Sequence, residues 1–165
     1  MRLEIQICLL KKQENKEIFL ARLMKKLFLI AAIFLITGGI TMSQELNQPF
    51  KKGEINPYNK YFSGTTYLNR LSANDNIWHS SIANVTFEKG ARTNWHKHSG
   101  GQILLVTAGE GRYQERGGEI RVLKQGDVVR IPLNVEHWHG AAPDSEFAHI
   151  SIETNLPNNE TTWLE

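Results

Sequence analysis

Three histidines and one glutamine are spaced in this sequence like the ligands of one divalent metal ion: His96, His98, Gln102 and His137. Residues two apart on an extended strand point to the same face, so His96 and His98 can face a common ion. Imidazole nitrogens and a carboxamide oxygen bind manganese, iron, nickel, copper or zinc. Four protein ligands leave positions open on an ion that accepts five or six, which predicts a reactive site.

The four residues lie in two glycine-bounded segments. Segment 90–109 holds the first three, and segment 126–141 holds His137 behind a proline. Together they resemble the cupin family, whose motifs are G-x5-H-x-H-x3/4-E-x6-G and G-x5-P-x-G-x2-H-x3-N. Both internal spacings are kept, and a weaker resemblance extends over about residues 61–153. The resemblance implies an all-β fold, the cupin jelly-roll β-barrel (double-stranded β-helix).

Three positions depart from the family pattern. Gln102 replaces the usual Glu, Asn134 a turn Gly, and Ala141 the final Asn. Asn tolerates the left-handed backbone region, and Ala141 removes only a local hydrogen bond. Gln102 matters chemically, because a neutral ligand leaves the metal centre at +2 where Glu would leave +1. We expect a stronger Lewis acid and a better anion site.

A closer resemblance narrows the chemistry. The runs Trp95-His-x-His, Gly101-Gln102 and His137-Trp-His-Gly-Ala-Ala-Pro143 look like the small manganese cupins with hydroxynitrile lyase activity. By that resemblance the four residues above are the metal ligands, and His139 and His149 are catalytic. Manganese is the implied metal, with iron or zinc as alternatives. The implied reaction interconverts a cyanohydrin, such as mandelonitrile, with an aldehyde and hydrogen cyanide.

The residues leave alternatives open at these positions. His139 shares a face with His137, so it either reaches the cavity or orients a ligand from behind. His149 alternates with two isoleucines; it points inward as an acid or base, or lies on a solvated face. Ala83, Val85 and Phe87 alternate along one strand and are either a substrate pocket or plain core.

Two other functions stay open, because one fold hosts unrelated chemistries. A cupin dioxygenase or other oxidoreductase would use the open metal positions for oxygen, although the missing Glu weighs against it. A non-enzymatic protein would use the metal to bind a small molecule. Oxygen consumption would identify the first, and binding without turnover the second.

Short apolar segments broken by Gly, Asn and Pro predict many strands, and no long helical pattern follows Met42. Gly117-Gly118 predicts a two-residue hairpin turn. Many short strands favour a double-sheet jelly roll. The strands are expected at 65–68, 78–87, 91–95, 102–108, 111–115, 119–124, 127–131, 136–139 and 147–154.

The N-terminal region has the features of a secretory signal. Residues 24–43 hold a lysine pair, an apolar core and small residues that suit cleavage after Ser43. Met24 is therefore expected to be the true start, so 1–43 is an upstream extension plus signal peptide. The product would be secreted or periplasmic, or membrane-anchored if uncleaved.

The rest of the chain is a polar arm, 44–60, and one domain, 61–165. Beyond residue 43 there are 12 basic and 14 acidic groups, a net charge of −2, with no basic run. This predicts a small-molecule substrate, no nucleic acid and, after signal cleavage, no membrane partner. Cys8 is the only cysteine, so thiol chemistry is absent from the mature chain. The arm and exposed strand edges favour a homodimer or higher homo-oligomer.

Overall fold

The computed structural model describes residues 13, 16–26 and 46–164. Contacts divide the chain into two units, Met1–Gln44 and Glu45–Glu165. In the first unit, residues 16–26 are helical and exposed. Most of the predicted signal segment, including the cleavage site after Ser43, lies outside the described residues. None of the described helical residues forms a helix long and apolar enough to cross a membrane.

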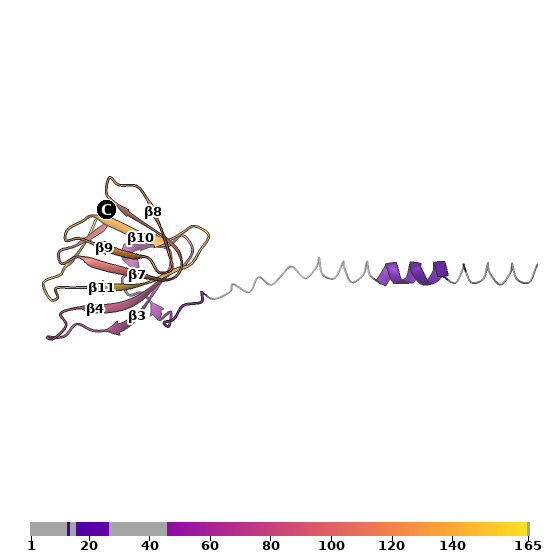
Figure 1. Ribbon diagram of the computed structural model, residues 1–165, viewed down its shortest axis with the longest axis horizontal. Coiled ribbons are helices and arrows are strands. Elements are labelled where there is room, and N and C mark those ends of the chain that lie inside the picture. The colour runs from indigo at the N-terminus through magenta and orange to yellow at the C-terminus, as the bar shows by residue number, and fades with distance from the viewer. Residues whose placement is uncertain (1–12, 14–15, 27–45, 165) are drawn as a thin grey trace, which may run out of the picture. The chain divides into compact units, whose positions relative to one another are not determined.

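Within residues 46–164 the chain is almost entirely strand and turn (Figure 1). The one short 3-10 helix is Asn59–Tyr61. The strands are β1 (Glu54–Ile55), β2 (Phe62–Ser63), β3 (Thr66–Ser72), β4 (Ser81–Phe87), β5 (Arg92–Thr93), β6 (His96–His98), β7 (Gln102–Glu115), β8 (Arg121–Lys124), β9 (Val128–Ile131), β10 (His137–Ala141), β11 (Phe147–Glu153) and β12 (Thr161–Trp163).

The strands form two layers joined by β7. In one layer β1, β3, β4, β11 and the first half of β7 are antiparallel neighbours, and β9 pairs with the other side of β7 (Figure 1). In the other, the second half of β7 pairs with β8 and β10, and β10 also contacts β5 and β6. The structure confirms the expected all-β jelly roll.

Gly109 lets β7 pass from one layer to the other. Its φ is +71°, and a side chain there would overlap the carbonyl oxygen of Glu146. Burial along β7 alternates up to Ala108 and then resumes one residue out of phase at Gly111. The sequence therefore predicted two strands, whereas the structure forms one 14-residue strand with a bend.

Two local predictions were wrong. The strand expected from Trp78 begins at Ser81, because the Asp75 carboxylate accepts hydrogen bonds from the backbone N–H groups of Ile77 and Trp78 and forms a turn. Trp78 is 74% exposed. The connection at Gly117-Gly118 is longer than two residues, since pairing between β7 and β8 ends at Tyr113 and Arg121.

The apolar core lies between the layers. Phe87, Leu104, Leu123 and Phe147 are fully buried, one from each of four strands. The ring centroids of Phe87 and Phe147 are 6.0 Å apart and tilted, a favourable aromatic arrangement. Truncating such a side chain costs about 3–5 kcal/mol, so this core fixes the strands that carry the polar interior beside it.

Candidate metal centre

Strands β6 and β10 bring histidines from the two sequence segments together. His96 pairs in register with His137, and their ring centroids are 4.2 Å apart. His98 lies two residues along β6 with its ring 5.1 Å from that of His96, while Lys97 between them is less buried. The alternation of an extended strand thus turns both β6 histidines inward, as the sequence predicted.

Backbone carbonyls set the orientation of two of these rings. His96 Nδ1 lies 3.0 Å from the carbonyl oxygen of Asn94, and His137 Nδ1 lies 2.8 Å from that of Val135. A carbonyl only accepts, so each Nδ1 carries the proton and donates it. Each Nε2 therefore keeps a free lone pair, which is the state that a metal-binding imidazole requires.

His98 is held by a side chain instead. Its Nδ1 lies 3.1 Å from the Thr161 hydroxyl oxygen and 4.0 Å from a carboxylate oxygen of Glu153. Its Nε2 is buried and has no hydrogen-bond partner in the described chain. A buried nitrogen without a partner costs free energy, and a bound metal ion at this nitrogen would remove that cost.

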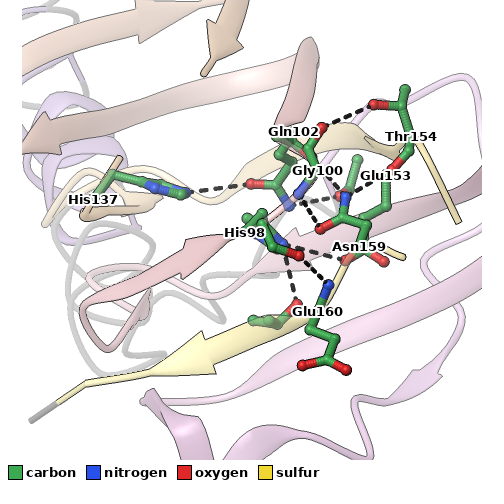
Figure 2. Close-up of polar contacts among 12 residues, drawn as sticks. His98, Gly100, Gln102, His137, Glu153, Thr154, Asn159 and Glu160 are labelled. Carbon is green, nitrogen blue, oxygen red and sulfur yellow. Dashed lines mark hydrogen bonds and ion pairs between the residues drawn. The ribbon is translucent and has the colours of Figure 1, made fainter. Parts of the chain in front are cut away.

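Gln102, at the start of β7, presents its oxygen to the same region (Figure 2). Its amide nitrogen donates to the Ser151 hydroxyl at 3.0 Å, and Gln102 Oε1 lies 3.4 Å from His137 Nε2. Because His137 carries its proton on Nδ1, these two atoms are both acceptors. Two ligand atoms that each lie about 2.1 Å from one ion are about 3.4 Å apart at a tetrahedral angle, so this separation fits a shared ion.

Burial keeps these histidines neutral. Removal from water lowers the pKa of His96 well below its usual value and lowers the pKa of His98 to about 4. It also lowers the pKa of His137. Neighbouring histidines lower the first two further, because two positive rings at this distance repel each other. The ring nitrogens that would bind a metal ion are therefore free of protons at neutral pH.

A third histidine from the second segment joins the group. Single ligand nitrogens of His96, His137 and His139 lie within 4.8 Å of one another, and all three residues are buried. These three histidines form a group able to bind a metal ion. The sequence assigned His139 to catalysis and His98 to the metal, so the geometry adds His139 as a further possible ligand.

His139 also contacts His149. His149 Nε2 lies 3.3 Å from His139 Nδ1, and the rings meet edge to face at 4.8 Å. Burial holds the pKa of His149 at about 4 and that of His139 well below its usual value. His139 Nε2 and His149 Nδ1 have no other partner among the described residues. His149 is fully buried, so it does not lie on a solvated face.

A cavity of about 560 Å³ reaches both histidine groups. The cavity is lined by His96, His98, Gln102, His139 and His149. His137 is not among the residues that line it. Of the predicted pocket residues, Ala83 and Val85 line the cavity. Phe87 does not: its ring is fully buried and packs 5.8 Å from His139 and 5.5 Å from His149. The Phe87 ring packs against both rings of the histidine pair.

The C-terminal segment 155–164, for which no element was predicted from the sequence, completes the site. Strand β12 pairs with β6, and Trp163 packs 4.8 Å from His96. Asn159 accepts from the backbone N–H of Gly100 and donates to the carbonyl oxygens of Gly101 and Thr154 (Figure 2). The contacts with His96, Gly100 and Gly101 join residues about 60 positions apart, so no local spacing could reveal them.

Residues 83–153 match the cupin domain. The chain is 41% identical to an (R)-mandelonitrile lyase from Granulicella tundricola over 105 residues, which cover 64% of this chain and 80% of that enzyme. The chain belongs to the cupin family.

Solved cupin structures agree with the fold. This cupin is 47% identical to a cupin-like protein from Thermotoga maritima, with a TM-score of 0.68 over 72% of this chain and 89% of that one. A cupin 2 conserved barrel domain protein from Rhodopseudomonas palustris, at 16% identity and a TM-score of 0.57, covers 73% of this chain and 79% of its own. That second match supports the fold alone.

Proposed function

We propose that this cupin is a metal-dependent lyase of the hydroxynitrile lyase type, which interconverts a cyanohydrin with a carbonyl compound and hydrogen cyanide. The identity with the Granulicella enzyme over most of its length supports this proposal. The observation that carries it is the neutral His139–His149 pair, which lines the same cavity as His96, His98 and Gln102. The cavity thus combines a metal centre with a proton-transfer pair.

The metal would be held by His96, His98, Gln102 and His137, and we propose manganese, with iron or zinc as alternatives. The buried, unpartnered Nε2 of His98 and the Gln102–His137 contact fit such an ion. Since all four ligands are neutral, the ion would supply its full positive charge to oxygen or cyanide in the cavity.

The histidine pair would move the proton. One hydrogen bond joins His149 Nε2 and His139 Nδ1, which leaves His149 Nδ1 and His139 Nε2 as the outer nitrogens. Because both rings are neutral, one outer nitrogen has a free lone pair and the other carries a proton. We assign the free lone pair to His149, which takes the cyanohydrin hydroxyl proton while the oxygen electrons form the carbonyl bond. The electron pair of the broken C–C bond leaves with cyanide, and His139 Nε2 gives cyanide its proton. The shared proton passes from His149 to His139 in the same step.

This assignment separates His139 from the metal ligands. A nitrogen that carries a proton has no lone pair for a metal, so His139 Nε2 would stay uncoordinated. Replacing His139 with Ala should therefore leave the metal content near that of the unsubstituted protein and remove turnover. A fall in metal content as large as that caused by His137→Ala would make His139 a ligand and contradict the assignment.

The first experiment is metal analysis and mandelonitrile cleavage on protein purified without chelator, beside the His96→Ala/His98→Ala variant. About one metal ion per chain, with cleavage that is lost in the variant, would support the proposal. Bound metal without cleavage would contradict the lyase and leave the cupin metal site; oxygen consumption would then point to a dioxygenase. Absence of bound metal would contradict the site itself.

A further inference from the structure

The part of the cavity wall that adjoins Gln102 is built from small side chains. Strands β7, β11, β4 and β3 are neighbours in that order, and the register places Leu104, Ser151, Ala83 and Arg70 in one cross-strand row. Ser151 and Ala83 line the cavity and leave space above them. The backbones of β7 and β3 are three strand spacings apart, about 14 Å.

Arg70 lies at the far end of this row. It is exposed at the cavity wall, and the ion pairs of the described chain lie elsewhere. Its guanidinium offers up to five N–H donors and no acceptor. A guanidinium that faces a cavity is suited to an acceptor group on a ligand.

Glu153 supplies a carboxylate near Arg70. It lines the cavity two residues beyond Ser151 on β11, and its side chain is 34% exposed. Burial raises the pKa of Glu153, while a hydrogen bond with Ser81 and the charge of Arg70 oppose that shift. Arg70 and Glu153, which both line the cavity, therefore present a strong donor and a strong acceptor to one ligand.

Part of the remaining wall is apolar. Tyr58, Leu68 and Leu156 line the cavity, which has the volume of roughly 19 water molecules at about 30 Å³ each. Hydrogen cyanide and a two-carbon aldehyde would leave most of this space to water. A flat apolar group above Ser151 and Ala83 would fill it and displace that water.

This inference rests on the proposed lyase function. We propose that the substrate is an aromatic cyanohydrin or aldehyde whose ring bears a hydroxyl group opposite the reacting carbon. The ring lies over Ser151 and Ala83, and the hydroxyl accepts from Arg70 and donates to Glu153. A carboxylate at the same place would meet Arg70 but would be repelled by Glu153. A hydroxyl satisfies both side chains.

The test compares mandelonitrile with its 4-hydroxy, 4-methyl and 4-carboxy derivatives, after subtraction of uncatalysed decay. Methyl matches hydroxyl in size but forms no hydrogen bond. We expect kcat/KM to favour 4-hydroxy over 4-methyl by about tenfold or more, which is the effect of a hydrogen bond to a charged group. Arg70→Met should bring the ratio close to one. Arg121→Met, the same change on an exposed strand outside the cavity, should keep the ratio. Equal kcat/KM for the two compounds, or a preference for 4-carboxy, would overturn the proposal.

A binding measurement distinguishes the failure of this inference from the failure of the lyase proposal. If no cyanohydrin is cleaved, the proposed function fails, but calorimetry can still measure binding of 4-hydroxybenzaldehyde and 4-methylbenzaldehyde to the metal-loaded protein. Tighter binding of the hydroxy compound that is lost in Arg70→Met and kept in Arg121→Met would support the subsite alone. Equal binding of both aldehydes would reject it.

Discussion

The Nε2 atom of His149 lies 3.3 Å from the Nδ1 atom of His139, and both rings are buried beside Phe87. The contact joins β11 to β10, two strands from different layers of the barrel. Because burial disfavours the charged form of each ring, the pair holds one shared proton between two neutral imidazoles. Removing one ring breaks the proton path and leaves the other ring in place.

His149→Ala should lower cyanohydrin cleavage by about 10²–10⁴-fold, the usual contribution of one general acid or base. Metal content should not change, because His149 is outside the proposed ligand set. Added imidazole should restore part of the activity by occupying the space of the missing ring. Initial rates with and without imidazole, together with metal analysis, check the prediction; unchanged turnover would dismiss the assignment of His149 as the base.

Gln102→Glu should tighten divalent-metal binding and reduce lyase activity. A carboxylate adds a negative charge beside the ion, which strengthens coordination but lowers the centre from +2 to +1 and weakens its hold on cyanide. The change also removes the donor that Gln102 presents to Ser151. Metal affinity and cyanide inhibition should be measured on both proteins. If cyanide inhibits both proteins equally, the neutral charge of Gln102 does not set the affinity of the site for anions.

Thr161→Val should weaken metal binding through His98. The Thr161 hydroxyl is 3.1 Å from His98 Nδ1, and Val removes it while keeping the shape of the side chain. Loss of a partner that orients a metal ligand typically costs 10–100-fold in metal affinity. Thr162→Val makes the same change on the exposed face of β12 and should leave affinity unchanged. Equal affinities for the two variants would mean that Thr161 does not orient His98.

The sequence predicted what local spacing encodes. Alternation on a strand was enough to turn His96 and His98 to one face, and likewise to place His149, Ser151 and Glu153 together. It could not show that His98 meets Thr161, because that contact depends on β12 folding back across β6. Phe87 continues the alternation of Ala83 and Val85, yet its ring is fully buried in the core, whereas those two residues line the cavity.

Gly109→Ala should destabilise the whole domain rather than the site alone. The left-handed backbone at Gly109 costs a residue with a side chain about 1–2 kcal/mol, and the added carbon overlaps the carbonyl of Glu146. We expect a loss of more than about 2 kcal/mol in the free energy of unfolding. Urea unfolding measures it, with Gly117→Ala as control: φ there is +83°, but nothing lies within 4 Å of the added carbon. A similar loss in both variants would assign the effect to backbone conformation alone.

The metal-free protein should lose stability as the pH falls from about 7 toward 4. The folded-state pKa of His98 and of His149 is about 4, whereas the same residues titrate near 6.5 when unfolded. Below pH 6.5 the unfolded chain therefore binds protons that the folded chain does not, and unfolding becomes more favourable. Each pKa unit of difference corresponds to about 1.4 kcal/mol per group, and the loss levels off once the folded histidines also titrate.

Urea unfolding of chelator-treated protein at pH 7.5, 6.0 and 5.0 measures this loss of stability. All three pH values lie above the range in which most carboxylates titrate. His149→Phe removes one of the groups, so its stability should depend less steeply on pH than that of the unsubstituted protein. A stability that does not change between pH 7.5 and 5.0 would mean that the buried histidines accept protons in the folded state as readily as in water.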